Sequence, residues 1–141
     1  MAAELPLGGL SVIAERGRVF FSIEKANRTL PLVRRIVQDV VTTYGQLRSL
    51  RDQLADSVDK GAIEREMEGQ SRRLEQLQSE LGLVGCELKD PGIGLVDFPG
   101  RYQSRDILLC WQLGEEKVAH WHELHAGAAG RRPISQLDEQ T

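Results

Sequence analysis

The chain has 141 residues, of which 40% are hydrophobic and 28% are charged, and its formal net charge is −3. This length and composition predict one soluble domain with a packed core. The acidic balance and an aromatic content of 5% argue against nucleic-acid binding, because cationic side chains neutralise phosphates and several aromatic rings are needed to stack bases.

Residues 1–17 are predicted to form a weakly ordered extension, because they show little periodicity and include three glycines. They have neither the basic segment nor the apolar run of a signal peptide. No stretch elsewhere approaches the roughly 20 apolar residues that cross a bilayer. We therefore expect a cytoplasmic protein without a membrane partner.

A single α+β domain is predicted over residues 18–134. Ser22 is a suitable helix N-cap, because its hydroxyl can accept a hydrogen bond from the first turn. A short helix is expected over residues 23–29. Pro31 fits the first turn of a new helix better than a helix interior. We therefore expect a break before Pro31 and a long helix over residues 31–56.

Both long helices carry an apolar stripe. In the first helix, apolar residues recur three and four positions apart at Val33, Val37, Val40, Tyr44, Leu47, Leu50 and Leu54. The second helix, predicted over residues 62–81, repeats this spacing with one polar position, at Ile63, Met67, Gln70, Leu74, Leu77 and Leu81. Such helices pack as an antiparallel, coiled-coil-like hairpin, here over about residues 31–81, with Gly82 as its C-cap. The stripe is too wide for two helices to cover, so we expect a homodimer of paired hairpins.

A small sheet is predicted over about residues 85–125. Four β-prone runs lie there, over residues 86–89, 93–98, 106–113 and 117–121. Turn-forming segments separate them, namely Asp90-Pro91-Gly92, Pro99-Gly100 and Gly114-Glu115-Glu116. Short strands separated by such turns are typical of an antiparallel meander. We expect the apolar run at Ile107–Trp111 to be its central strand. Residues 135–141 are expected to form a polar tail.

The two cysteines, Cys86 and Cys110, are isolated in the sequence. Their spacing gives neither a disulfide framework nor a paired zinc motif. We therefore expect two buried thiols in a reducing compartment.

All three histidines lie in the segment His120-Trp121-His122-Glu123-Leu124-His125. On a strand, His120 and His122 would point to the same face and could share a metal ion, with His125 or Glu123 as a third ligand. Imidazole and carboxylate ligands suggest zinc. Ordinary hydrogen bonding is the alternative, because the spacing differs from the His-Glu-x-x-His motif of zinc proteases.

Asp97 lies inside an apolar run. If its carboxylate is buried, it must be paired or protonated; the candidate partners are Arg101, Arg105 and Arg131. Alternatively, it faces water on a half-exposed strand. Asp97 or Cys110 could also approach the histidines from a neighbouring strand.

The segment Gly127–Ile134 combines glycines with Arg131 and Arg132. Exposed backbone N–H groups and guanidinium groups can hold a phosphate or a carboxylate. The spacing matches neither a P-loop nor a dinucleotide-binding motif. A tight turn whose arginines pair with nearby carboxylates is the simpler interpretation.

Several motifs in this order resemble a prokaryotic family, domain of unknown function 2203. They are Phe21-Ser22-Ile23-Glu24-Lys25-Ala26-Asn27 with Leu30-Pro31, Gly85 to Asp90, Gly94 to Pro99, Leu109-Cys110-Trp111, Trp121-His122 and Gly127 to Ile134. The resemblance covers about residues 18–134. It implies a fold and a bacterial setting, and it implies no activity.

The resemblance also bears on the candidate site. The family pattern has a pair like Trp121-His122 with an acidic residue after it, and it does not require the other two histidines. It usually has phenylalanine where this chain has Ala128. A shared polar site would therefore combine Asp97, His122, Glu123 and Arg131.

The sequence favours a non-enzymatic interaction or scaffold protein that forms a homodimer through its hairpin. The alternative is a metal-dependent or small-anion-binding enzyme whose site lies around His122, Asp97 and Arg131. The sequence decides neither between these classes nor the identity of a substrate or protein partner.

Overall fold

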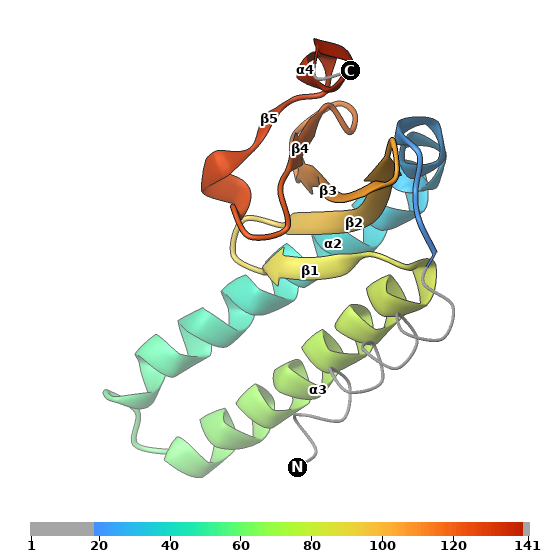
Figure 1. The fold of residues 1–141 in the computed structure, drawn as a ribbon. Coiled ribbons are helices and arrows are strands. Elements are labelled where there is room, and N and C mark those ends of the chain that lie inside the picture. Colours follow the sequence, from blue (N-terminus) through green and yellow to red (C-terminus); the bar gives the residue numbers. More distant parts are fainter. Residues whose placement is uncertain (1–18, 140–141) are drawn as a thin grey trace.

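The computed structural model describes residues 19–139, so the expected N-terminal extension lies outside the described residues. Two long helices lie side by side and one half of this hairpin packs against a small sheet (Figure 1). The elements in chain order are α2 (Ile23–Leu54), α3 (Lys60–Val84), β1 (Glu87–Asp90), β2 (Leu95–Tyr102), β3 (Arg105–Gln112), β4 (His120–His122), the 3-10 helix η1 (Ala128–Gly130), β5 (Arg132–Pro133) and α4 (Ser135–Glu139). No helix among these residues is long and apolar enough to cross a membrane.

The sheet has the strand order β1-β2-β3-β4-β5, and every neighbouring pair is antiparallel. It is therefore a meander, and the predicted α+β class with a helical hairpin is confirmed. β3 is the middle strand, as expected for the apolar run Ile107–Trp111.

α2 begins at the expected N-cap, where the hydroxyl of Ser22 accepts a hydrogen bond of 3.0 Å from the backbone N–H of Lys25. The expected break before Pro31 is wrong, because α2 is one helix that contains Pro31. A proline inside a helix removes one backbone hydrogen bond. The buried side chains of Leu30 and Val33 flank Pro31 and hold both sides of it against the core.

α3 continues to Val84, two residues past the expected C-cap at Gly82. Its C-cap is Gly85, which has a φ of 113°. A glycine in this left-handed conformation commonly closes a helix. Gly82 is instead buried within the last turns of the helix.

β2 runs through the Pro99-Gly100 dipeptide, so the expected turn there is wrong. Pro99 lies beyond the part of β2 that pairs with β1. On that side β2 has only an isolated bridge to Phe21, whose N–H donates to the carbonyl oxygen of Pro99, so the missing N–H of proline is tolerated. The chain reverses instead at Gln103 and Ser104, whose φ values of 51° and 66° are typical of a two-residue hairpin turn.

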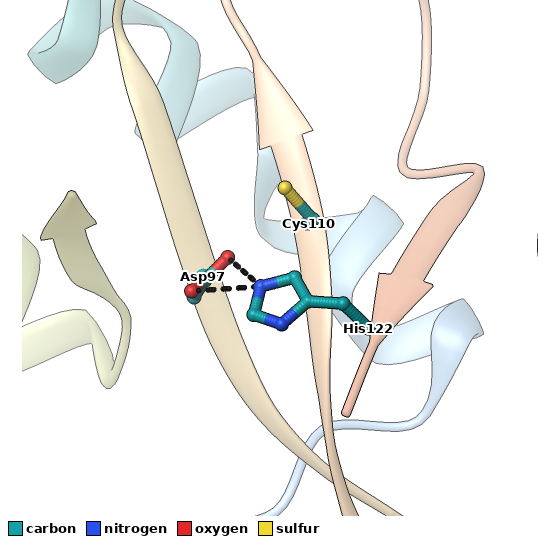
Figure 2. A group of neighbouring side chains, drawn as sticks. All are labelled: Asp97, Cys110 and His122. Atoms are coloured by element: carbon teal, nitrogen blue, oxygen red, sulfur yellow. Dashed lines mark hydrogen bonds and ion pairs between the residues drawn. The ribbon is translucent and has the colours of Figure 1, made fainter. Parts of the chain in front are cut away.

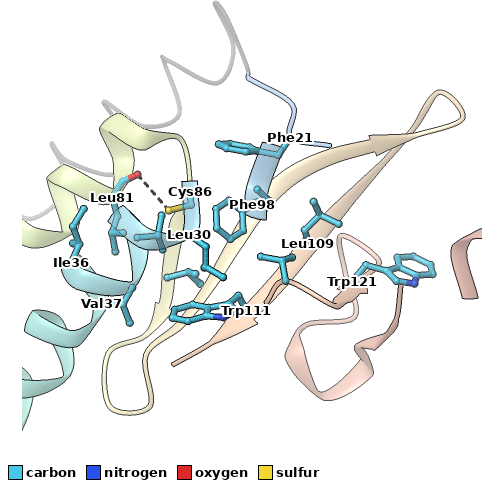
Figure 3. Packing of buried hydrophobic residues seen from close by; sticks show 14 of the residues in the cluster. Phe21, Leu30, Ile36, Val37, Leu81, Cys86, Phe98, Leu109, Trp111 and Trp121 are labelled. Atoms are coloured by element: carbon cyan, nitrogen blue, oxygen red, sulfur yellow. Dashed lines mark hydrogen bonds between the residues drawn. The ribbon is translucent and has the colours of Figure 1, made fainter. Parts of the chain in front are cut away.

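The core lies between the helices and one face of the sheet. Phe98, Leu109 and Trp111 point from β2 and β3 toward Leu30 and Val37 of α2 (Figure 3). Since side chains alternate along a strand, the residues between them face the opposite side of the sheet. That opposite face carries Asp97 and Cys110.

Only the half of the hairpin next to the sheet contributes to this core. Within the described residues, α2 has no buried residue after Thr43, and α3 has none before Leu77. Seven large apolar or aromatic side chains of the other half are half-buried: Tyr44, Leu47, Leu50, Leu54, Ile63, Met67 and Leu74. We call residues 44–76 the distal hairpin.

The end of the chain differs from the expected polar tail over its described part. Ser135–Glu139 form the short helix α4, and Leu137 in it is 2% exposed. Leu137 is apolar and packs with the core residues, which explains the order of this segment.

Candidate functional site

The sheet register brings three chemically reactive side chains together on the face opposite the helices. Asp97 on β2 is paired with Cys110 on β3, and Cys110 is paired with His120 on β4. His122 is two residues further along β4, so it lies on the same face as His120. His120 and His122 therefore lie on one face of the sheet, as the sequence predicted.

Asp97 and His122 form a buried pair. Nε2 of His122 lies 3.1 Å from each carboxylate oxygen of Asp97, and both side chains are 2% exposed. Figure 2 shows the His122 ring directed from β4 toward Asp97 on β2. The sequence suggested an arginine as the partner of Asp97, and the structure places a histidine there.

The contact of the second ring nitrogen of His122 determines how many protons the pair holds. Nδ1 lies 2.8 Å from the backbone carbonyl oxygen of Glu123. A carbonyl can only accept, so Nδ1 must carry a hydrogen. A close contact between Nε2 and a carboxylate then requires one more proton, held either by His122 or by Asp97. The pair therefore shares one proton inside the protein.

Cys110 completes the cluster. One ligand atom from each of Asp97, Cys110 and His122 can be chosen so that all three lie within 4.8 Å of one another. Burial raises the pKa of the Cys110 thiol to about 11, although a hydrogen bond from Arg131 partly opposes this effect. The free thiol is therefore protonated at neutral pH and is a poor nucleophile.

Arg131 borders the cluster and is held by Glu115. Its Nη1 donates to Sγ of Cys110 at 3.8 Å and to Oε1 of Glu115 at 3.3 Å, and its Nη2 donates to the other Glu115 oxygen. Burial alone would raise the pKa of Glu115, but the hydrogen bonds from Arg131 and from the backbone of Gln112 outweigh it and lower that pKa. The same bonds with Glu115 raise the pKa of Arg131.

Glu115 was missed as a site residue because its segment, Gly114-Glu115-Glu116, resembles a turn. It does lie at a turn, where the backbone N–H of Gln112 also donates to its carboxylate at 2.9 Å. The pairing of an arginine from Gly127–Ile134 with a carboxylate was expected in general terms, but nothing in the sequence distinguishes Glu115 from Glu116.

The other candidate residues lie around the cluster. His120 is half-buried, with Nδ1 at 3.8 Å from a Glu115 oxygen. The carboxylate of Glu123 lies 3.5 Å from Arg105. His125 is exposed in the loop after β4. Of the three histidines, His122 alone belongs to the cluster of possible metal ligands in the described part of the chain.

Both cysteines are buried free thiols, as their isolated positions suggested. Cys86 lies away from the polar cluster, and its Sγ is 3.6 Å from the backbone carbonyl oxygen of Leu81 near the end of α3. Burial raises the pKa of Cys86 to about 12.

Fold and site together define an α+β protein in which a helical hairpin covers one face of a meander and a buried Asp–Cys–His cluster occupies the other. Residues 19–134 match the model of the family described as "Uncharacterized conserved protein (DUF2203)". The chain belongs to this family, and the resemblance noted in its motifs is confirmed. No curated protein sequence and no solved structure matches the chain.

Proposed function

We propose that this chain is an interaction protein that self-associates through its distal hairpin. The observation that carries the proposal is the absence of any buried residue in the described residues 44–76, although seven large apolar or aromatic side chains line the two helices there. Half-buried apolar surface is stabilised when another surface covers it. The sheet lies beside the other half of the hairpin and reaches this half only near its border, where Tyr44 lies next to Gly92 and Leu74 packs against the core.

A second copy of the chain is the occupant that the charges favour. α2 contains six Lys and Arg residues against three Asp and Glu, whereas α3 contains four against five. In a twofold dimer, the basic α2 of each copy can pack beside the acidic α3 of the other, and symmetry makes this contact twice. The result is a four-helix arrangement in which each hairpin covers the other.

Light scattering during size-exclusion chromatography tests this proposal. At micromolar concentration, we expect a mass near twice the 15.8 kDa of one chain. A monomer across the whole concentration range would contradict self-association.

Charge reversal tests the arrangement of the helices. Arg48 and Arg51 are exposed on α2, and Glu64 and Glu66 are exposed on α3. We expect R48E/R51E and E64R/E66R each to weaken self-association about tenfold, and an equal mixture of the two variants to restore it. No recovery in the mixture would rule out the packing of α2 beside α3.

A second candidate function is binding or catalysis of a small ligand around Asp97, His122 and Arg131. It is favoured by the buried Asp97–His122 pair, because burying ionisable groups is costly and the hairpin does not need them. A surface depression of about 580 Å³ lies between α2 and the turn that carries Glu115. An anion binding to Arg131 would have to displace Glu115.

Inorganic phosphate is a suitable probe for the anion-binding form of this candidate. We expect phosphate to raise the melting temperature of the wild-type protein more than that of the R131Q variant. R132Q is the matched control, since Arg132 is exposed and lies over the ring of Trp121. Equal shifts of the melting temperature in all three proteins would rule out anion binding at Arg131.

A further inference from the structure

We propose that Asp97, Cys110 and His122 bind a divalent transition-metal ion of the zinc class, through a carboxylate oxygen, Sγ and Nε2. The proposal identifies the ligand of the second candidate function and therefore rests on that candidate, whereas it is independent of self-association. It differs from the histidine-based site suggested by the sequence, because two of the three ligands come from other strands.

The spacing of the three ligand atoms fits one ion. In a tetrahedral zinc site, ligand atoms lie roughly 3.3–3.6 Å apart, given zinc–nitrogen and zinc–oxygen distances of about 2.0–2.2 Å and a zinc–sulfur distance of about 2.3 Å. Nε2 of His122 is 3.1 Å from the Asp97 oxygens, and the three ligand atoms lie within 4.8 Å of one another. These separations differ from those of a bound site by about 1 Å.

The surroundings of His122 select the nitrogen that would bind. Its Nδ1–H donates to the carbonyl oxygen of Glu123 at 2.8 Å, so Nε2 is the nitrogen directed at Asp97. Histidines that bind metals usually donate their other N–H to a carbonyl or carboxylate, which fixes the ring. His122 therefore already has the support that a metal ligand requires.

Arg131 favours the charged form of Cys110 that binds metals, whereas burial keeps the free thiol protonated. Nη1 of Arg131 lies 3.8 Å from Sγ, and Glu115 holds the guanidinium group through Nη1 and Nη2. A positive charge and a hydrogen bond stabilise a thiolate once the ion has displaced its proton. Arg131 thus acts as a positioning residue next to the proposed ligand set.

Ion binding also conserves the charge of this buried region. The metal-free cluster holds one proton between His122 and Asp97 and one on the Cys110 thiol. A divalent ion that forms bonds to Nε2, a carboxylate oxygen and Sγ displaces both protons to solvent. The two positive charges of the metal ion replace those of the two protons, which avoids the cost of adding net charge to a buried site.

The chemistry of the ligands selects the class of metal. Magnesium and calcium prefer oxygen ligands, so a set with one sulfur, one nitrogen and one oxygen disfavours both. Zinc and cobalt accept this mixture in tetrahedral sites. Three protein ligands leave a fourth position for water or a small ligand, which is the arrangement found in catalytic zinc sites.

Cobalt titration of metal-stripped, full-length protein provides the first test. We expect stoichiometric binding, with the visible bands of tetrahedral cobalt and a near-ultraviolet band from thiolate-to-cobalt charge transfer. The C110S variant should lose the charge-transfer band, whereas C86S should keep it. Cys86 is an equally buried thiol that lies outside the cluster, so C86S is the matched control.

Competition with zinc should measure the contribution of each ligand. D97N and H122Q should each weaken zinc binding by more than the roughly 10–100-fold that loss of an outer-shell partner causes. X-ray absorption of zinc-loaded wild-type protein requires no variant, so it decides the question if a variant does not fold. We expect one sulfur ligand and two or three nitrogen or oxygen ligands.

Three results would overturn the proposal: no stoichiometric cobalt binding, a charge-transfer band that survives in C110S, or a zinc environment without sulfur. These outcomes are separate from a failure of the enzyme candidate, because cobalt spectra and X-ray absorption do not depend on turnover. A metal-loaded protein that has no activity would support the ion site and would argue against the enzyme.

Discussion

Asn27 shows how one side chain near the start of α2 positions the strand that carries His122. Its Oδ1 accepts a hydrogen bond of 2.8 Å from the backbone N–H of Val118, and its Nδ2 donates to the backbone oxygen of Val118 at 3.3 Å. Val118 is 1% exposed, so its backbone groups have little access to water. Asn27 therefore satisfies both groups just before β4 begins.

We expect Asn27→Leu to destabilise the protein by about 1–3 kcal/mol, because a buried N–H and C=O would lose their partner. Urea unfolding measures this change. Gln38→Leu on the exposed surface of α2, outside the distal hairpin, is the control and should change stability by less than about 0.5 kcal/mol. Equal stability of the two variants would show that Asn27 does not hold the strand.

Gly94 fixes the start of β2, three residues before Asp97. Its φ is +72°, and an added Cβ would lie 2.7 Å from Cγ1 of Val37 and 2.8 Å from Cβ of Leu113. We expect Gly94→Ala to cost about 2–4 kcal/mol, from steric overlap in the core and a strained backbone. Equilibrium denaturation measures this cost.

Gly45 provides the opposite case on an exposed helix surface. A Cβ there would have no atom within 4 Å, so we expect Gly45→Ala to stabilise the protein by about 0.5–1 kcal/mol. Destabilisation by Gly45→Ala would indicate that a partner packs closely on this part of α2, as a second hairpin could.

The thiol of Cys86 predicts a loss of stability in alkaline solution. Its pKa rises from 9.0 to about 12 on burial, so above pH 9 the unfolded chain releases this proton more readily than the folded protein does. The unfolded state then binds fewer protons, and stability falls as pH rises from about 9 to 12 by up to about 1.4 kcal/mol per pH unit. Below pH 9 the thiol is protonated in both the folded and the unfolded state, so it contributes no pH dependence to the stability.

Comparison with a Cys86→Ala variant isolates this effect, because lysines, tyrosines and Cys110 titrate in both proteins. We expect the difference in unfolding free energy between wild type and variant to shrink between pH 8 and pH 10.5. A constant difference would mean that the Cys86 thiol is not the source of the dependence.

At the scale of elements, local patterns predicted most of the helices and strands. The hydroxyl of Ser22 predicted where α2 begins, because this cap is a contact within the first turn of the helix. Pro31 and Pro99 were misjudged for a shared reason, because core packing and an edge position compensate for the missing N–H. The turn at Gln103 and Ser104 lacks the glycine or asparagine that usually marks one.

The candidate site was harder to predict from the sequence, because it depends on strand register. Alternation places His120 and His122 on one face, which needs no knowledge of neighbours. That Cys110 lies opposite Asp97, and that His122 reaches across to it, follows from pairings between strands that the sequence does not specify. The approach of Glu115 to Arg131 likewise depends on the path of the chain between β3 and β5.

At the scale of the whole molecule, the sheet separates the helical hairpin from the candidate polar site. The hairpin lies on one face, and the Asp97–Cys110–His122 cluster lies on the other (Figures 1 and 2). The proposed surface for self-association is further along the hairpin, beyond the sheet. Substitutions in one region should therefore leave the other intact, which allows the two proposals to be tested separately.

The uneven core predicts an uneven distribution of local stability along the hairpin. The half of the hairpin that packs on the sheet includes Val33 and Val37 on α2 and Leu81 on α3, which are all fully or nearly fully buried. The distal hairpin has no buried residue within the described chain. Segments with few buried contacts open at a lower free energy than the core.

Hydrogen exchange at two protein concentrations therefore tests this distribution and the proposed dimer together. At nanomolar concentration, amides in residues 44–76 should exchange faster than those near Val37 and those in β3. At high micromolar concentration, self-association should slow exchange in residues 44–76 by mass action and leave β3 unchanged. If exchange in the distal hairpin is slow at both concentrations, the two helices of one chain hold each other closed and no second copy is needed.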